Sequence, residues 1–521
     1  MVASAKAAPA PRPISMEECL NLALEHNLDI RIQRITPRLA SLSLYGTYAA
    51  YDPSLSGSFS HSDSASPSGV DPQGRPYTPT ESRKDAFNFA LSGLGPLGET
   101  YRLGASMNDT YGTRPGLAAD PFNPVWSTNA FTFLVPTNLA GQQATVISQG
   151  PGVMTVVNGF RTADAFAGLT LTQPLMKNFW IDDARLSITL RRHDLKSSEQ
   201  DFRQTVIATV SGVQTAFYNL IAARETVTVQ IKALELAEEL LRENHKRVEV
   251  GVLAPLDEKQ AESQVAASRA DLLGAQNSAR TAQNALKSLI SDRFESWKDV
   301  ELEPTEKLSR IAEVLNRQDS WSKGLTMRPE LIKARIDLQK RNVTLRYDRN
   351  QLYPQLDLTG SFGLAGSATE FSGALGGVTD RENPAFSFGV QFAMPLSRRA
   401  ARTAYRMDKE ALEQALLSLK KLEQGIMIEI DNAIATAQTR FQQVEATGAA
   451  VVYAEAAVDA ERKKLDNGKS TNFQVISLQR DLSLRRYEGI AAMVGYNTAL
   501  VSLAQSEGAT LERSRINLEI K

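Results

Sequence analysis

Two long stretches without proline set the scale of anything this chain can fold into. No proline occurs between Pro174 and Pro255 or after Pro395, so nothing forces a helix to break there. In the first stretch, apolar residues recur every seven positions, at Val206, Val213, Leu220, Val227, Leu234, Leu241 and Val248. Such a repeat is typical of a coiled coil. We predict helices over 183–249 and 399–466, each roughly 100 Å long at ~1.5 Å per residue, which exceeds a compact domain.

The chain follows the same plan twice. Three motifs return in the second half, at Pro53 and Pro354 (Pro-x-Leu), Pro174 and Pro395 (Pro-Leu), and Gly251 and Gly468 (a glycine after a long helical stretch). Such internal repetition indicates two copies of one structural unit. We therefore predict two repeats, 15–290 and 325–510, joined by an equatorial connector over 291–324. The remaining predicted segments are a disordered N-terminal extension over 1–14, an insertion over 62–165, return helices over 255–290 and 471–510, a strand hairpin over 355–395 and a tail over 511–521.

Both predicted long helices end in sharp turns. Gly251 suits the left-handed position that often follows a helix, and Pro255 suits the first turn of the returning helix. At the other turn Gly468 ends the helix, and Thr471 with Gln474 matches a capping box. Ser15 and Glu18 match the same motif before the first helix.

The sequence also contains segments with strand alternation. Residues 355–364 and 385–394 each carry apolar side chains at even positions, except for Gly360, and small or polar residues at odd ones. This length and alternation match a transmembrane β-strand, although a strand of a soluble sandwich alternates too. Open sheet edges are forbidden in a membrane, so a barrel built from so few strands requires several protomers. We predict a mixed, mainly α fold, in which an α-helical barrel adjoins an antiparallel β-barrel completed by trimerisation.

The first strand region is longer than the second. Residues 62–81 are rich in Ser, Pro and Gly and are expected to form a loop. Further strand candidates are 87–91, 101–107, 130–135 and 167–171. Two extra strands could join the barrel or form an external hairpin above it, and we favour the external hairpin.

Composition excludes several classes of function. The formal net charge is −1, which gives no electrostatic case for nucleic acid. Cys19 is the single cysteine and His26, His61, His193 and His245 are scattered, so neither a disulfide nor a metal site is expected. We predict a buried or half-buried Cys19 thiol and a hairpin loop at 373–377. No nucleophile and base are paired in the sequence, so we expect neither an enzyme nor a cofactor.

The sequence shows the pattern neither of a membrane-spanning helix nor of a signal peptide. No run approaches the roughly 18 to 20 apolar residues of a membrane-spanning helix, and residues 1–13 lack the apolar core of a signal peptide. Taken alone, this pattern indicates a soluble protein. If the barrel prediction holds, we expect the export signal to be removed or to lie upstream.

At this point the sequence resembles the TolC-like outer-membrane efflux protein family (outer membrane factors). The resemblance covers Ser15 to about Glu507 and is carried by Met16–Leu24, Asn27–Ile30, Arg328–Leu331 and the doubled Pro-x-Leu, Pro-Leu and glycine motifs. It implies a homotrimer in outer-membrane lipid, with a helical tunnel in the periplasm. It also implies an equatorial belt, for which Phe294–Lys323, with Trp297 and Trp321, is the candidate.

The resemblance further implies a site at the helix-hairpin turns. In this family the turns dock on a membrane-fusion adaptor that links the tunnel to an inner-membrane pump. Carried over, the docking residues are Val250, Gly251, Val252, Leu253, Ala254, Pro255, Asn467, Gly468, Lys469, Ser470 and Thr471. The alternative is that these are only well-capped turns.

The family's tunnel entrance is often narrowed by acidic side chains at the sixth and ninth positions after the second turn glycine. Here those residues are Gln474 and Ser477, whereas the first turn has Asp257 at its sixth position. The usual acidic constriction is therefore not reproduced.

We predict a passive outer-membrane conduit of a tripartite efflux pump or a type I secretion system. The alternative is a periplasmic adaptor or coiled-coil scaffold, although one helical hairpin, not two, would be expected there. A simple porin is excluded because most of the chain is predicted to be helical.

Overall fold

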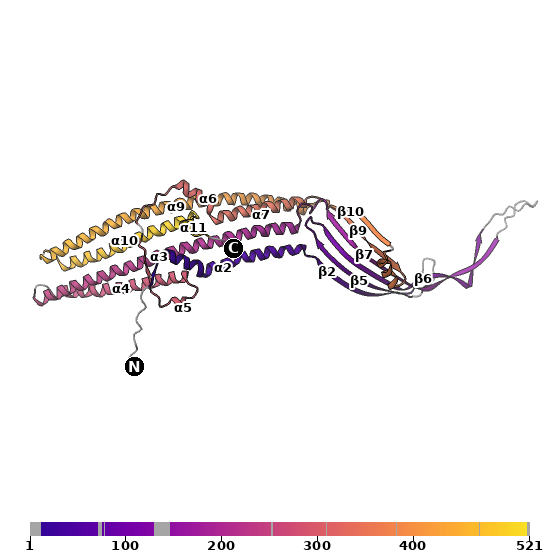
Figure 1. Cartoon of the computed structure of the whole chain (residues 1–521), viewed down its shortest axis with the longest axis horizontal. Helices are drawn as coiled ribbons and strands as arrows, with labels where there is room; N and C mark the ends of the chain where they lie inside the picture. Colours follow the sequence, from indigo (N-terminus) through magenta and orange to yellow (C-terminus); the bar gives the residue numbers. More distant parts are fainter. Residues whose placement is uncertain are drawn as a thin grey trace, which may run out of the picture. The chain divides into compact units, whose positions relative to one another are not determined.

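The computed structural model describes residues 12–70, 76–77, 79–129, 146–251, 254–308, 310–381, 383–467 and 469–517. It divides into two compact units. The first, which is mainly helical, comprises the residues up to Gly46 with Ile188–Thr344 and Met407–Lys521. The second comprises Thr47–Ser187 and Leu345–Arg406 and is built on a β-sheet (Figure 1).

Long helices dominate the described chain. They are α1 (Met16–His26), α2 (Leu28–Thr47), α3 (Asp183–Glu249), α4 (Pro255–Ile290), α6 (Arg317–Met327), α7 (Pro329–Gln351), α9 (Arg399–Asp466) and α10 (Asn472–Ser506). Shorter ones are η1 (Tyr48–Tyr51), α5 (Phe294–Trp297), α8 (Phe371–Thr379) and α11 (Thr510–Arg513). The bounds of α3 and α9 are those expected for the two long helices, and α4 has the bounds expected for the first return helix. The second return helix, α10, ends four residues before the predicted position 510.

The two chain ends are more structured than predicted. Arg12–Ile14, assigned above to a disordered extension, forms β1, which pairs in parallel with β8 (Leu302–Pro304). The side chain of Ile14 is fully buried. In the predicted tail, Leu511 is buried within α11. A local sequence gives no sign of these contacts, because each depends on a distant partner.

The predicted heptad seam of α3 is buried in its first half only. Val206, Val213 and Leu220 are fully buried in a cluster that also contains Cys19, which confirms the predicted buried thiol. Nearer the turn, burial shifts to Ala237, Leu240 and Asn244, while Leu234, Leu241 and Val248 are only half-buried. The packing partners change there to α9 and α10, through Leu465, Val475 and Ile476.

The prediction that no run of residues approaches a membrane-spanning helix also needs correction for α3. One 18-residue window of α3 has a mean hydropathy of 1.4 and at most two charged residues, which by length and composition alone would suffice. Half of that window is buried inside the protein. The apolar residues of α3 between Phe202 and Ile221 form the main helical core, so packing explains their composition.

The second unit contains a six-stranded antiparallel sheet. Its strands are β2 (Ser54–Ser66), β5 (Thr80–Leu94), β6 (Thr100–Asn129), β7 (Val146–Pro174), β9 (Gln355–Ala368) and β10 (Asn383–Ala393). Their order is β10-β9-β7-β6-β5-β2. A separate pair joins β3 (Gly69–Val70) to β4 (Pro76–Tyr77).

Three predictions for this region need correction. The strands β5 and β6 lie inside the sheet between β2 and β7, so the preference for an external hairpin was wrong. Ser62–Ser66 belongs to β2 and is not loop. Residues 371–379 form the helix α8 where a hairpin loop was expected at 373–377. The strand candidate 130–135 lies outside the described residues.

The sheet has two chemically different faces. Residues opposite one another in an antiparallel register share a face, and one such row joins Leu55, Leu91, Leu103, Leu169, Phe362 and Phe386. Alternate residues on the other face are small or polar, as in Ser54, Ser56, Ser58, Ser60, Ser62 and Ser64 of β2. The apolar side chains are exposed in the single chain, Phe388 to 76%. This unit therefore carries a wide apolar surface, which the described chain covers only in part, where α8 packs against Met107, Ala163 and Ala165.

Candidate functional site at the helix-hairpin turns

The first hairpin turn joins α3 to α4. Gly251 has φ +74° and its N–H donates to the carbonyl of Val248 at 2.9 Å, which confirms the predicted left-handed helix end. Pro255 occupies the first turn of α4, where its missing N–H costs nothing. Val252 and Leu253 lie outside the described residues.

The second hairpin turn joins α9 to α10. The Oγ1 atom of Thr471 accepts from the N–H of Gln474 at 3.4 Å, which confirms the predicted N-cap. Ser470 donates from Oγ to the carboxylate of Glu461 at 2.5 Å, and the N–H of Lys469 donates to the carbonyl of Lys464 at 2.8 Å. These contacts close the turn onto α9. Gly468 lies outside the described residues.

The structure brings the two hairpins together close to their turns. The buried side chain of Asn472, 2% exposed, donates from Nδ2 to the carbonyl of Asp257 at 3.2 Å. Two turns further along α10, the Nε of Arg480 donates to Oε1 of Gln264 in α4 at 2.6 Å. Gln264 is held in turn by a bond from its Nε2 to Oγ of Ser268 at 3.2 Å. The site is thus a four-helix junction of α3, α4, α9 and α10.

An ion pair joins the longer helices of the two hairpins. Arg462 of α9 lies 2.7 Å from the carboxylate of Glu239 and 4.0 Å from that of Glu243, both on α3. All three side chains are partly exposed, so the interaction is screened by solvent and contributes modestly. With the Asn472 and Arg480 contacts, it makes the hairpin junction mainly polar.

The core of this junction contains polar atoms without partners. Within the described part of the chain, Asn244 Oδ1 and Nδ2, Asn472 Oδ1 and Gln479 Nε2 are buried without a hydrogen bond. Each such atom costs about 1–3 kcal/mol relative to a satisfied one. The neighbouring apolar cluster is small, comprising Leu240, Leu465, Val475 and Ile476. The junction thus has a smaller apolar cluster than the main helical core and buried polar atoms inside it.

His245 connects α3 to α4 across the first turn. Its Nδ1 lies 2.7 Å from Oε1 of Glu258, and its Nε2 lies 3.4 Å from a carboxylate oxygen of Glu249. The hydrogen bond to Glu258, followed by the negative charge of Glu249, raises the pKa of His245 above its ordinary value. This histidine therefore gains a proton more readily than a free one, which strengthens the hairpin in acid.

The surface of both turns carries exposed apolar side chains. Val250, Leu256 and Phe473 are 73%, 67% and 66% exposed. Of the predicted entrance residues, Asp257 is half-buried beside Asn472, whereas Gln474 and Ser477 are exposed on α10. Sequence reasoning missed Asn472, Gln264 and Arg480, because their partners lie more than 200 residues away in the chain.

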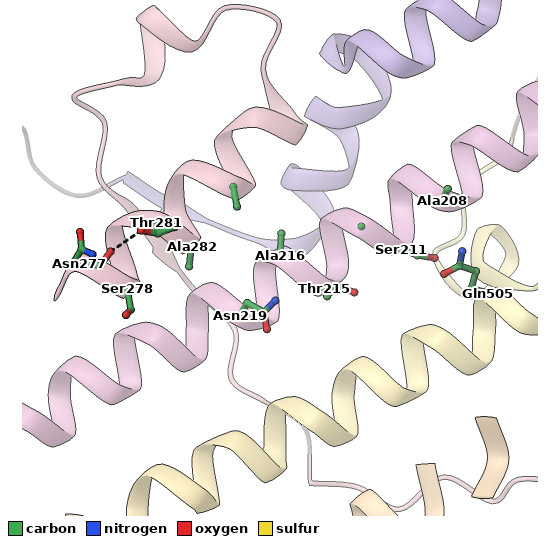
Figure 2. A pocket seen from close by; sticks show the side chains of 12 residues that line it. Ala208, Ser211, Thr215, Ala216, Asn219, Asn277, Ser278, Thr281, Ala282 and Gln505 are labelled. Atoms are coloured by element: carbon green, nitrogen blue, oxygen red, sulfur yellow. Dashed lines mark hydrogen bonds between the residues drawn. The ribbon is translucent and has the colours of Figure 1, made fainter. Parts of the chain in front are cut away.

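A shallow cleft of about 690 Å³ lies elsewhere in the helical unit, where α3 faces α4 (Figure 2). It is lined by small or uncharged side chains, among them Ala208, Ala216, Asn277 and Ala282, with Gln505 from α10. The hydroxyl of Thr281 donates to the carbonyl of Asn277 at 3.0 Å within α4. The side chains that line the cleft include hydroxyls and amides but no charged group. No cluster of three or more metal-ligating side chains occurs among residues whose placement is described.

Comparisons with known proteins agree with this architecture. The chain matches the family model described as "Outer membrane efflux protein" over residues 157–291 and 322–509, more than half its length. It is 24% identical over 332 residues to the pyoverdine export outer membrane protein OpmQ of Pseudomonas aeruginosa, spanning 63% of this chain and 67% of that protein. It is 23% identical over 341 residues to the cobalt-zinc-cadmium resistance protein CzcC of Cupriavidus metallidurans, spanning 62% and 76%.

Solved structures show the same fold. The outer-membrane channel OprN superposes with a TM-score of 0.64 at 15% identity, covering 95% of this chain and 90% of that one. The open-state MtrE outer membrane channel of Neisseria gonorrhoeae superposes with a TM-score of 0.60 at 14% identity, covering 95% and 89%.

Proposed function

Because this chain belongs to the outer membrane efflux protein family, we propose that it forms a homotrimeric conduit served by a periplasmic adaptor and an inner-membrane pump. It is an outer-membrane efflux channel with a periplasmic extension. Its family consists of outer membrane channel proteins. In the proposal the protein conducts substrates passively, and the pump supplies the energy.

The main support for this proposal is the six-stranded sheet of the described chain, with its two unpaired edges and its apolar face. Within the described chain, the edge strands β2 and β10 each have one neighbour, and the apolar face crosses all six strands. Unpaired strand edges are excluded from a lipid environment. Pairing β2 of one copy with β10 of the next would remove them. Three copies of six strands would give eighteen strands, and barrels of about this size leave an aqueous channel. The serine-rich face would then line the pore and the apolar face would contact lipid.

The helical unit offers a second surface for association. Leu28, Ile32, Ile35, Leu39 and Leu42 follow a 4-3-4-3 spacing along α2 and are each between 51% and 65% exposed. That spacing places them on one face, as in the seam of a coiled coil. A second copy of the chain is the occupant that fits, because it would extend the same coiled-coil packing. The small side chains of the cleft in Figure 2 would let a neighbouring helix approach closely.

The hairpin turns are proposed as the adaptor-docking surface. The described part consists of Val250, Gly251, Ala254, Pro255, Asn467, Lys469, Ser470 and Thr471, and the exposed side chains of Val250, Leu256 and Phe473 support an apolar contact there. Asp257, Gln474 and Ser477 are proposed to border the tunnel entrance. Separation of the two hairpins would open it, and the polar junction with unsatisfied buried atoms supports such a movement.

The trimer is tested by measuring the mass and shape of the detergent-purified protein. Light scattering should give three chains per particle, and electron-microscope class averages should show a hollow particle. A solid monomeric or dimeric rod that needs no detergent would contradict the conduit and favour the adaptor or scaffold.

Adaptor docking is tested separately. Phe473→Asp should abolish co-purification of the adaptor while leaving the trimer intact. Leu484→Asp is the matched control, since Leu484 is also exposed on α10 but lies three turns from the hairpin turn. Equal adaptor binding by both variants would overturn docking at the turns.

A further inference from the structure

The helix α8 lies on the apolar face of the sheet. It connects β9 to β10, and its fully buried Ala374 packs against Met107, Ala163 and Ala165. Met107 pairs with Ala165 across β6 and β7, so both belong to the face that carries the leucines and phenylalanines. This is the face that the proposed function directs toward lipid. A helix in this place therefore lies outside the proposed barrel, away from the pore.

Glycines fix α8 tightly against the sheet. A Cβ added to Gly366 of β9 would come within 2.0 Å of the carbonyl oxygen of Ala374. A Cβ on Gly377 of α8 would come within 3.0 Å of the Gly366 Cα. Backbone therefore rests directly on backbone, which only glycine permits at this distance. The helix is a packed element of the sheet surface.

An aromatic row leads from the sheet onto this helix. The ring of Phe59 lies 4.7 Å from that of Phe87, and Phe87 lies 6.0 Å from Phe371 at the start of α8 in an edge-to-face arrangement. Aromatic side chains gather at both boundaries of the apolar band in transmembrane barrels. The row thus marks one boundary of the band.

Pairs of polar and charged side chains begin immediately beyond the aromatic row. On the same face, His61 lies 2.6 Å from Asp85 and Arg161 lies 2.7 Å from Asp109. In the register, His61 and Asp85 are opposite each other and lie two residues along their strands from Phe59 and Phe87, hence on the same face. An arginine and two aspartates gathered on one face are not expected to contact hydrocarbon. The aromatic row therefore lies at the change from apolar to charged surface.

The exposed side of α8 is apolar at this boundary. Phe371 and Leu375, four residues apart and hence on one side of the helix, are 39% and 47% exposed. The helix contains no charged residue, and Glu370, Asp380 and Arg381 lie just outside its ends. The helix thus turns apolar side chains outward at the boundary, with charged residues only beyond its two ends.

The geometry points to α8 as an interfacial helix that inserts Phe371 and Leu375 into the lipid of the outer leaflet, an inference that rests on the proposed function. The chain enters the sheet at Ser54 and leaves it at Ala393, and the β9–β10 connection lies at the opposite end of both strands. Because the helices that flank the sheet are periplasmic, that opposite end is the outer one. The lipid contact would fix the depth of the sheet in the membrane.

The test uses spin labels in the full-length trimer reconstituted into phospholipid vesicles. Leu375→Cys is compared with Phe388→Cys, on the apolar face of β10, and with Asp63→Cys, in the charged region. The native Cys19 does not interfere, because burial raises the pKa of its thiol to about 12 and the thiolate is the reactive form. The collision rate of each label is then measured once with oxygen, which concentrates in lipid, and once with a water-soluble nickel complex, which is excluded from it.

We expect the Leu375 label to give a several-fold higher ratio of oxygen to nickel collisions than the Asp63 label. A Leu375 ratio equal to that of Asp63, with Phe388 in lipid, would overturn the interfacial helix and leave the proposed function intact. A Phe388 label that is itself in water would overturn both.

A second pair of variants tests the position of α8 on the sheet. Gly366→Val, in the Leu375→Cys background, should displace α8 and lower the oxygen-to-nickel ratio several-fold. Gly360→Val is the control, because it lies on the same strand and face with nothing within 4 Å of an added Cβ. An unchanged ratio in Gly366→Val would contradict the placement of α8 on the membrane side of the sheet.

Discussion

Arg480 offers the sharpest test of the proposed opening of the channel at the hairpin junction. Its Nε donates to Oε1 of Gln264 at 2.6 Å, across the gap between α10 and α4. Gln264 is 9% exposed, so Arg480→Ala leaves a buried amide oxygen without this partner. A hydrogen bond to a charged group contributes about 1.5–3 kcal/mol. Arg480 itself is exposed and regains water when the bond breaks, so the lower value of about 1.5 kcal/mol applies.

That free energy converts into a change of population. About 1.4 kcal/mol corresponds to a factor of ten in an equilibrium constant, so each protomer should separate its hairpins roughly tenfold more often. If one separated pair suffices for opening, the open probability rises about tenfold. If all three must separate independently, the rise approaches a thousandfold, because the three free energies add. Single-channel recording in planar bilayers distinguishes these cases, and uptake of a large antibiotic by cells provides a second readout.

Two arginines on the same helix serve as controls. Arg485 pairs with Asp481 and Glu488 inside α10. Arg486 pairs with Glu455 of α9, which belongs to the same hairpin. Neither pairing joins the two hairpins, so alanine at either position should leave the open probability nearly unchanged. The reasoning is refuted if Arg480→Ala opens the channel no more than Arg485→Ala. It is equally refuted if Gln264→Ala adds its full effect to that of Arg480→Ala, since both remove one bond.

Three further predictions follow from other parts of the molecule. Phe388→Lys should lower the resistance of the trimer to heat and urea in membranes, because a lysine at the centre of a lipid-facing strand costs ~2–4 kcal/mol. Ser387→Lys, on the opposite face of the same strand, should not lower it. Equal effects of the two variants would refute the assigned faces. The raised pKa of His245 means that its contribution to the first hairpin is complete below the ordinary histidine value of about 6.5 and is lost as pH rises through the raised value. Hydrogen exchange of residues 254–258 should therefore accelerate from pH 6 to 8.5 after correction for intrinsic rates, and His245→Gln should abolish that excess; an identical excess in the variant would exclude the histidine. Leu39→Asp should weaken trimerisation in light scattering while Ser41→Asp, on the opposite side of α2, leaves it intact; an unaffected trimer in Leu39→Asp would remove the α2 stripe from the interface.

Much of the helical part could be predicted because its causes are local. The absence of proline, the heptads and the capping residues locate α3, α4 and α9, and these signals act within a few residues of where they occur. The left-handed Gly251, the N1 position of Pro255 and the caps at Ser15 and Thr471 were predictable for the same reason. The alternation in residues 355–364 likewise predicts one strand with one apolar face.

The strand candidates 87–91 and 101–107 of the insertion do lie in β5 and β6, but the place of these strands in the sheet could not be assigned from the sequence, since it is set by pairing. The serine-rich β2 is exposed along its whole length and has little strand preference of its own. Its backbone is held by β5, which in turn pairs with β6, and that pairing places β5 and β6 inside the sheet. The helix α8 forms from a glycine-rich segment because it packs on Gly366, a contact that no local rule contains.

The sequence by itself determined the long helices, their turns and the alternating strands, because each follows from backbone preference and periodicity over neighbouring residues. Only the tertiary structure decided which residues join the two hairpins. Asn472 reaches Asp257 and Arg480 reaches Gln264 across more than 200 residues of chain, and hydrogen bonds of this kind depend on the distance between helices rather than on spacing in the sequence. The candidate docking turns were thus visible in the sequence, while the polar junction that holds them together was not.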